Sequence, residues 1–174
     1  MNKNLTMNEP RTLLLSGKKV EQCIIRLAYQ IYEDNSMEKE IILAGIKTNG
    51  YFLCEKIASA IRSISPLIIV LAEVQIDKHS QVNKDIVISI SKDQLIGKVV
   101  ILIDDVLNSG KTMMFALKPF LDADIKKIRT VVLIDRNHKR FPIAADYTGL
   151  SLSTTLKEHV TVEFIPEGIV AWLH

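Results

Sequence analysis

Cysteine and long apolar runs are both scarce in this chain. Its 174 residues include only two cysteines, Cys23 and Cys54. Both fall on the apolar faces of predicted helices, which indicates reduced, buried thiols and not a disulfide framework. The longest apolar runs, such as residues 67–72, are far shorter than the roughly 20 residues of a membrane span, and residues 1–11 are too polar for a signal peptide. These absences predict a cytoplasmic protein without a membrane partner.

An excess of charge of either sign is also missing. The chain carries 22 basic and 20 acidic side chains, so its formal net charge is only +2, and this balance does not indicate binding to nucleic acid or to a membrane surface. Its histidines show no metal-ligand spacing, which argues against a structural zinc site. An apolar content of 48% and a length of about one domain predict a single globular domain over residues 1–174, with a mobile start at residues 1–14.

Helical and strand-like apolar patterns alternate along the chain. Apolar residues recur at helical spacing over residues 20–31, 53–64 and 111–121. Runs typical of buried strands occupy residues 41–46, 67–74, 86–90, 99–103 and 128–134, and after an irregular stretch a last strand is expected at 160–165. The polar residues 76–84 are predicted to form a flexible loop. This alternation favours right-handed crossovers, and therefore an α/β fold with a parallel twisted sheet flanked by helices.

Two adjacent carboxylates follow the strand predicted at 99–103. Burying either one without a partner would cost roughly several kcal/mol, so Asp104 and Asp105 are expected where the strand has left the core. A small polar turn follows at residues 108–112 and opens a helix, whose unpaired N-terminal amides make an anion site. A nucleoside-triphosphate P-loop is excluded, because Asp105 stands where that pattern requires a glycine upstream of Gly110. An acid pair beside such a turn indicates a phosphorylated sugar as the ligand.

Three predicted turns follow predicted strands, at residues 47–50, 104–112 and 135–140. In open α/β sheets, ligands bind outside the carboxyl ends of the strands. If these strands run parallel, the three turns meet on one rim of the sheet and form a single site.

The acid pair and the turn after it resemble the phosphoribosyl diphosphate (PRPP) motif of the type I phosphoribosyltransferases. The resemblance implies that Asp104 and Asp105 are the catalytic pair and hold the ribose 2′- and 3′-hydroxyls. It implies a 5′-phosphate site made by Asn108, Ser109, Gly110, Lys111 and Thr112. It also implies a Mg²⁺ ion that travels with PRPP and is held near the two aspartates, mainly by other oxygens. Transfer of ribose 5-phosphate needs positioning and charge stabilisation, and no nucleophilic side chain.

Two further segments resemble the pyrimidine-operon attenuator/uracil phosphoribosyltransferase family. Residues 44–50, Ala-Gly-Ile-Lys-Thr-Asn-Gly, are similar to its diphosphate loop, Gly-Ile-Lys-Thr-Arg-Gly. Residues 135–149 are similar to its Asp-Arg-Gly-His-Arg-Glu-Leu-Pro-Ile-Arg-Ala-Asp-Tyr-Val-Gly segment. The resemblance implies a homodimer or larger homo-oligomer and a diphosphate site made by Lys47, Thr48, Asn49 and Gly50. The base pocket that it implies is bordered by Val106, Asp135, Arg136 and His138.

The chain departs from this family pattern in two places. Asn49 stands where the pattern has arginine, so the diphosphate site loses a positive charge and a bidentate donor. The flexible hood of relatives carries a Tyr-Arg-Asp-Asp-like signature, whereas the hood here is shorter and lacks that arginine. Its charged residues are Asp77, Lys78 and Lys84, and one of the two lysines is expected to supply the charge. Without such a donor the rate would fall by about a hundredfold or more.

These patterns support three functions. The first is transfer of ribose 5-phosphate from PRPP to a nucleobase, with uracil the first choice because of residues 135–149. The second is a pyrimidine-nucleotide-sensing RNA-binding regulator, whose phosphate contacts would come from a basic face of Lys126, Lys127, Arg129, Arg136, Lys139 and Arg140. The third, favoured by Asn49 and the altered hood, is a catalytically weak paralogue that binds PRPP or nucleotides.

Overall fold

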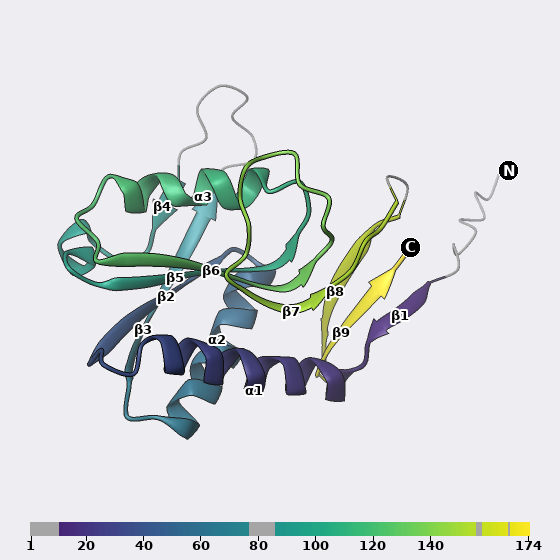
Figure 1. Ribbon diagram of the computed structural model, residues 1–174, viewed down its shortest axis with the longest axis horizontal. Helices are drawn as coiled ribbons and strands as arrows, with labels where there is room; N and C mark the ends of the chain where they lie inside the picture. The colour runs from purple at the N-terminus through teal and green to yellow at the C-terminus, as the bar shows by residue number, and fades with distance from the viewer. Residues whose placement is uncertain (1–10, 77–85, 156–157, 167) are drawn as a thin grey trace, which may run out of the picture.

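A computed structural model describes residues 11–76, 86–155, 158–166 and 168–174. A 6-stranded sheet with the order β4-β3-β2-β5-β6-β7 forms its centre, and a 3-stranded sheet with the order β1-β9-β8 stands beside it (Figure 1). The elements are β1 (Thr12–Leu15), α1 (Gly17–Asp34), β2 (Glu40–Ile46), α2 (Asn49–Ile64), β3 (Ile68–Ile76), β4 (Ile86–Ile88), a 3-10 helix (Lys92–Leu95), β5 (Val99–Leu107), α3 (Lys111–Leu121), β6 (Lys127–Asp135), β7 (Tyr147–Ser151), β8 (Val160–Ile165) and β9 (Gly168–Leu173).

The central sheet is parallel except at one edge. β2 pairs in parallel with β3 and with β5, β5 pairs in parallel with β6, and β6 with β7, whereas β4 runs antiparallel to β3. Apolar residues are buried on both faces of β2 and of the first half of β5, as expected for strands that are covered by helices on both sides. The predicted α/β class with a parallel sheet flanked by helices is confirmed.

Alternate residues of the central strands pack against different helices, because successive side chains of a strand point to opposite faces. Ile41 and Leu43 belong to the core that includes the buried faces of α1 and α2, whereas Ile42 and Ala44 belong to the core that includes the buried face of α3. Figure 1 shows α1 and α2 on one face of the sheet and α3 on the other. The three helices therefore cover both faces of the sheet and leave the ends of its strands uncovered.

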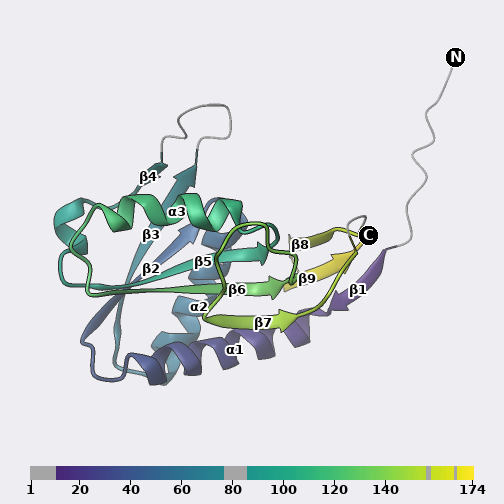
Figure 2. The ribbon, with the colours of Figure 1, turned by 45° about the horizontal axis from the view of Figure 1, so that its top comes forward.

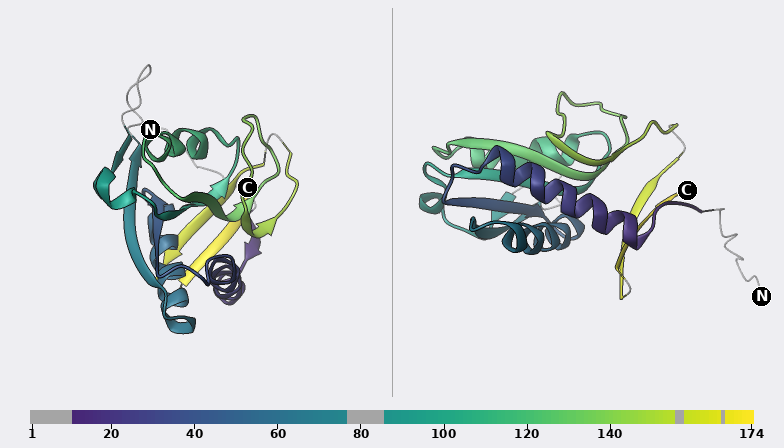
Figure 3. Two further views of the ribbon diagram at one scale, coloured as in Figure 1. Left: turned by 60° about the vertical axis from the view of Figure 1, so that its left-hand side comes forward. Right: turned by 60° about the horizontal axis from the view of Figure 1, so that its bottom comes forward.

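The small sheet joins segments from near both ends of the chain. β1 pairs antiparallel with β9, and β9 pairs antiparallel with β8; Figures 2 and 3 show these strands side by side. Trp172 on β9 donates from Nε1 to Glu163 Oε2 on β8 at 3.1 Å, and the Arg11 guanidinium lies 5.8 Å from the Trp172 ring centroid. Val162 and Ala171 are buried in the core that includes α1 and α2, so the small sheet is packed onto that helical layer.

The structure differs from the sequence expectations at several boundaries. Residues 12–14, expected in a mobile start, belong to β1 and pair with β9. β7 lies within the stretch expected to be irregular, and β9 extends the fold beyond the last predicted strand. β5 does not end at Ile103 but continues to Leu107, because pairing with β6 extends past the two aspartates. Ile76, expected in a loop, ends β3.

Both cysteines are free thiols. Cys54 is buried on α2, and its Sγ donates to Leu43 O at 3.4 Å. Burial raises the pKa of the Cys54 thiol to about 12. Cys23 is only half-buried, so the expectation of a buried thiol is wrong for this residue. In the part of the chain that the structure describes, no helix is long and apolar enough to cross a membrane.

Candidate active site

The carboxyl ends of β2, β5 and β6 meet on one rim of the central sheet. Parallel pairing aligns Gly45 with Ile103 and Ile103 with Val131, so the segments after these strands leave the sheet together, as the sequence predicted. A cavity of about 520 Å³ lies between this rim and β8 of the small sheet. Its walls are formed by Ile46, Lys47, Thr48, Asn49, Ile76, Asp104, Asp105, Val106, Asn108, Thr112, Phe115, Arg136, His159, Val160, Thr161 and Val162.

Asp104 and Asp105 lie within β5, and both are half-buried in the cavity wall. The pairing of β5 with β2 ends at Ile103. Beyond that point each carboxylate accepts the N–H of the next residue: Asp105 N donates to Asp104 Oδ1 at 3.0 Å, and Val106 N donates to Asp105 Oδ1 at 2.9 Å. These bonds fix the orientation of the two acids at the site.

The loop at residues 47–50, which was expected to bind diphosphate, places Asn49 across the cavity. Asn49 is the first residue of α2, and its Nδ2 donates to Asp105 Oδ2 at 2.8 Å and to Val162 O on β8 at 3.2 Å. The next residue, Gly50, packs so closely on β5 that an added Cβ would lie 2.7 Å from Ile103 O. The start of α2 therefore touches both the acid pair and the small sheet.

Lys47 supplies the positive charge of the same loop. Its Nζ lies 3.4 Å from Glu73 Oε1 on β3, and both side chains are partly exposed. The backbone N–H of Lys47 donates to Val74 O at 2.9 Å, and the peptide bond between Lys47 and Thr48 is cis. Exposed ion pairs are weak, so an incoming anion can take the place of Glu73.

The turn before α3 has the features of a phosphate site. Gly110 is the N-cap and adopts φ +83°, a left-handed conformation that glycine adopts without steric cost. The carbonyl of Ser109 accepts the backbone N–H groups of Arg140 and Phe141, which fixes the turn to the chain after β6. The first turn of α3 contains no acidic residue. Its positive end is therefore not neutralised locally and can hold an anion.

Arg136 is only 3% exposed, although it also lines the cavity. Its guanidinium donates to Thr154 Oγ1 and to Asn108 Oδ1, both at 3.0 Å, and to the carbonyls of Thr155 and Glu158. Glu158 accepts the N–H of Thr155, and this bond, helped by Arg136, lowers the pKa of the Glu158 carboxyl. Arg136 thus ties the phosphate turn to the segment before β8.

The cavity includes some of the expected site residues and not others. Asn108 and Thr112 of the phosphate turn line it, as does Val106 from the expected base pocket. The remaining turn residues, Ser109, Gly110 and Lys111, and two residues of the expected base pocket, Asp135 and His138, are not among its lining residues. The hood residues Asp77, Lys78 and Lys84 lie outside the described residues.

Asp135 is occupied by protein contacts. Its Oδ1 accepts the N–H of Asn137 at 2.8 Å, and its Oδ2 lies 3.0 Å from Lys139 Nζ. Asp135 as a whole is 7% exposed, so these contacts satisfy a nearly buried charge. Asp135 therefore shapes the turn after β6 and does not face the cavity.

One wall of the cavity was not assigned from the sequence. This wall is β8 with the residue before it, and it contributes His159, Val160, Thr161 and Val162. The strand itself was predicted from its alternating pattern. Its place opposite the acid pair was not, because that depends on pairing with β9 and packing against α2, which local periodicity does not reveal.

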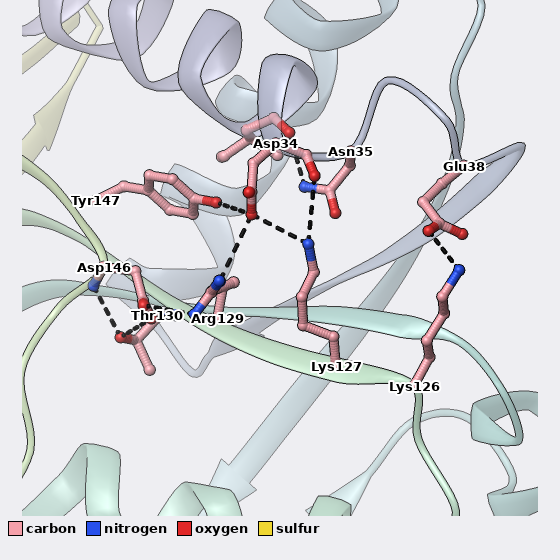
Figure 4. A network of polar contacts seen from close by, with 10 residues as sticks. Asp34, Asn35, Glu38, Lys126, Lys127, Arg129, Thr130, Asp146 and Tyr147 are labelled. Carbon is pink, nitrogen blue, oxygen red and sulfur yellow. Dashed lines mark hydrogen bonds and ion pairs between the residues drawn. The ribbon is translucent and has the colours of Figure 1, made fainter.

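A network of charged side chains joins the end of α1 to β6 and β7 (Figure 4). Asp34 Oδ2 accepts the Tyr147 hydroxyl at 2.6 Å and lies 3.1 Å from Lys127 Nζ and 3.5 Å from Arg129 Nε. The Tyr147 bond and then the Lys127 bond lower the pKa of Asp34. Burial and the bond to Asp34 raise the pKa of Tyr147 above its usual range. This network fixes the edge strand β7 to α1.

Ion pairs in this network and after β6 involve most of the basic face considered for RNA. Its basic residues pair with carboxylates at 2.6 to 3.5 Å: Lys126 with Glu38, Lys127 and Arg129 with Asp34, Arg129 also with Asp146, and Lys139 with Asp135. Arg136 is buried and not on a face at all. Acidic residues of α1 and of the adjoining segments therefore compensate much of the charge of this face.

The donor set at the acid pair fits a magnesium ion that is held indirectly. Asp104 and Asp105 supply the carboxylate oxygens that Mg²⁺ prefers. Both oxygens of Asp105 already accept N–H groups, which favours contact through water or ligand oxygens. Among the described residues, no group of three or more His, Cys, Asp and Glu side chains is placed to hold a metal ion by itself.

Comparisons with known proteins connect this geometry to a family. The model of the phosphoribosyl transferase domain matches residues 11–164. The protein named "Bifunctional protein PyrR" from Brevibacillus brevis is 32% identical over 160 residues, which are 88% of this chain and 89% of that protein. Its namesake from Clostridium botulinum is 37% identical over 161 residues, with coverage of 88% and 89%. The hypoxanthine phosphoribosyltransferase of Trypanosoma cruzi shares the fold, with a TM-score of 0.75 at 15% identity over 92% of this chain and 95% of that one.

Proposed function

Because the chain belongs to the phosphoribosyl transferase domain family, within its PyrR group, and is a phosphoribosyltransferase, we propose that it transfers ribose 5-phosphate from PRPP to uracil. Diphosphate is the leaving group. The observation that carries this proposal is that the acid pair of β5 and the turn before α3 border one cavity. The two features together suit a ribose that bears a 5′-phosphate.

In this proposal the acid pair and the turn hold the donor. Asp104 and Asp105 accept hydrogen bonds from the ribose hydroxyls, and the amides and the Thr112 hydroxyl at the start of α3 hold the 5′-phosphate. As the diphosphate leaves, the anomeric carbon gains positive charge, which the nearby Asp105 carboxylate stabilises. The loop 47–50 receives the diphosphate through its backbone amides and through Lys47. No protein side chain forms a covalent bond to the sugar.

Mg²⁺ is the cofactor that we propose for this site. Asp104 and Asp105 would hold it indirectly, through water and the oxygens of the donor, because the oxygens of Asp105 already accept N–H groups. When bound, the ion neutralises charge that develops on the departing diphosphate. The two aspartates orient the ribose whether or not they touch the ion.

The nucleobase would lie between the rim and the β8 wall. Val106, Val160 and Val162 contribute apolar residues to this part of the cavity wall, and Thr161 contributes a polar one, the mixture that binds small heterocycles. The choice of uracil is supported by the resemblance of residues 135–149 to the pyrimidine-specific family and by membership of the PyrR group.

A panel of labelled uracil, hypoxanthine, guanine, adenine and orotate tests the proposal. Each base is incubated with PRPP and Mg²⁺, and nucleotide formation is followed. Turnover with uracil alone is the expected result. Turnover with a purine and not with uracil would overturn the choice of base. No nucleotide formation with any of the five bases would overturn the proposed transfer reaction.

A weak enzyme that mainly binds PRPP or nucleotides is the second candidate. Two observations favour it: Asn49 replaces the family arginine and bonds to Asp105, and Lys47 is paired with Glu73. Both reduce the positive charge offered to the diphosphate. Calorimetry with PRPP and Mg²⁺ separates the candidates, because this second function predicts binding without turnover.

Sequence-specific RNA binding has less support from the structure. The relatives are named bifunctional, but the ion pairs of Figure 4 compensate Lys126, Lys127 and Arg129, half of the basic residues that would contact phosphates. We expect a filter-binding titration to show weak binding with no sequence preference. Tight, sequence-dependent binding with a steep salt dependence would restore the regulatory function.

We also propose that the protein works as a homodimer or larger homo-oligomer in the cytoplasm. Ile25 and Tyr29, one turn apart on α1, are 46% and 55% exposed, and exposed apolar surface often marks a protein contact. The free thiols are compatible with a reducing compartment. Sedimentation equilibrium measures the assembly state, and a monomer at micromolar concentration would contradict the first part.

A further inference from the structure

Asn49 connects the two sheets at the cavity. Its Nδ2 lies 2.8 Å from Asp105 Oδ2, on the central sheet, and 3.2 Å from Val162 O, on the small sheet. A primary amide nitrogen carries two N–H donors, so these two acceptors use both. The Asn49 side chain therefore has no N–H left for a diphosphate, although the backbone amides of the loop remain.

Both ends of this connection are held firmly. Asp105 is fixed by the N–H of Val106 on its other oxygen. Val162 is 6% exposed and pairs with Ala171 of β9, which is fully buried. The side chain of Asn49 thus spans between two elements that have little freedom of their own.

A second contact between α2 and β8 lies about one helical turn after Asn49. Phe52 of α2 packs against Phe164 of β8, with ring centroids 5.5 Å apart. Residues three apart on a helix and two apart on a strand lie on the same face of each element. Asn49 with Phe52 and Val162 with Phe164 therefore form one continuous seam between α2 and β8.

We propose that Asn49 is a positioning residue, which holds the β8 wall of the base pocket at a fixed place relative to Asp105, and that its side chain is not a ligand of the diphosphate. The inference rests on the proposed function, since it assigns the base to the β8 wall and the ribose to Asp105. It gives this departure from the family arginine a role of its own. In this chain the amide links the two ligand-binding walls where the family pattern has a cation.

Kinetics of Asn49→Ala and Asn49→Asp test the inference. Asn49→Asp preserves shape but replaces both donors by a carboxylate that repels Asp105, and Ser59→Ala, on the exposed face of α2, is the matched control. We expect each Asn49 variant to raise the KM for the base and to lower kcat, both by about tenfold, because misplaced walls lose orientation. For Asn49→Ala, which adds no charge, inhibition by inorganic diphosphate should stay within about twofold of wild type. Weaker diphosphate inhibition of Asn49→Ala with an unchanged KM for the base would overturn the inference and make Asn49 a diphosphate ligand.

Hydrogen–deuterium exchange gives a readout that needs no turnover. Without ligand, the amides of β8 should exchange several-fold faster in both Asn49 variants than in wild type and in Ser59→Ala. Equal exchange in all four proteins would overturn the inference even if the enzyme is active. Conversely, faster exchange at β8 together with an inactive wild type would support the role of Asn49 and reject the proposed transfer reaction, so the two failures are distinguishable.

Discussion

Replacing Arg136 by alanine should both destabilise the fold and weaken the phosphate turn. The guanidinium bonds to Thr154, Asn108 and the carbonyls of Thr155 and Glu158, and it is buried. Hydrogen bonds that involve a charged group contribute about 1.5–3 kcal/mol each. Asn108 and Thr155 are exposed, so water can replace the guanidinium there, and the loss should come mainly from the other two acceptors.

Removing the buried charge also removes its desolvation cost, which offsets part of that loss. The expected decrease in the free energy of unfolding is therefore about 2–3 kcal/mol. Urea denaturation measures it, provided that the m value stays unchanged. Arg140→Ala is the control, because Arg140 is exposed and should change stability by less than about 0.5 kcal/mol.

The same variant should bind PRPP less tightly, because Asn108 at the phosphate turn loses its partner. Calorimetric titration with PRPP and Mg²⁺ measures the change. If Arg136→Ala unfolds like Arg140→Ala, the guanidinium contributes no net stability and the magnitude argued above is wrong. If stability falls but PRPP affinity does not, the link between Arg136 and the phosphate turn is refuted.

Three more predictions concern the acid pair, the start of α2 and the buried thiol. The double variant Asp104→Asn/Asp105→Asn should lose at least about a hundredfold in turnover with PRPP; wild-type rates would remove the catalytic role of the pair. Gly50→Ala should lower the free energy of unfolding by about 1–3 kcal/mol in urea denaturation, since its Cβ would lie 2.7 Å from Ile103 O and 3.0 Å from Asp104 Cα; unchanged stability would show that α2 moves freely. Cys54, with a pKa of about 12, should be about one part in 10⁴ thiolate at pH 8 and react with iodoacetamide only after unfolding, as peptide mapping can show.

The fold class was predictable because the central strands and helices have apolar patterns that can be recognised within each segment. Residues 41–46 and 99–103 are uniformly apolar, and such runs alternating with amphipathic helices specify a covered parallel sheet. β1 and β9 were not predictable in the same way. The pairing of β1 with β9 joins distant parts of the chain, and the short pattern of β1 contains no sign of that partner. β9 also pairs with its neighbour β8, but its apolar run lacks the alternation that revealed β8.

In the candidate site, too, some features could be predicted from local sequence and others could not. The positions of Asp104, Asp105 and the turn after them follow from strand order and motif, so sequence reasoning placed them on the correct rim. The orientation of side chains does not follow from motif. Arg136 lines the cavity but is fully engaged by protein acceptors, and Asp135 turns away toward Lys139. Such outcomes depend on competition among neighbours that are distant in the sequence.

The location of the chain's single tryptophan has a practical consequence. Trp172 lies on β9, opposite Thr161 of the cavity wall, with its indole N–H bonded to Glu163. Indole emission responds to such polar surroundings, so the protein carries a natural optical reporter beside its ligand cavity. Stopped-flow fluorescence can therefore measure the rate at which a nucleotide binds beside β8 in the unlabelled protein.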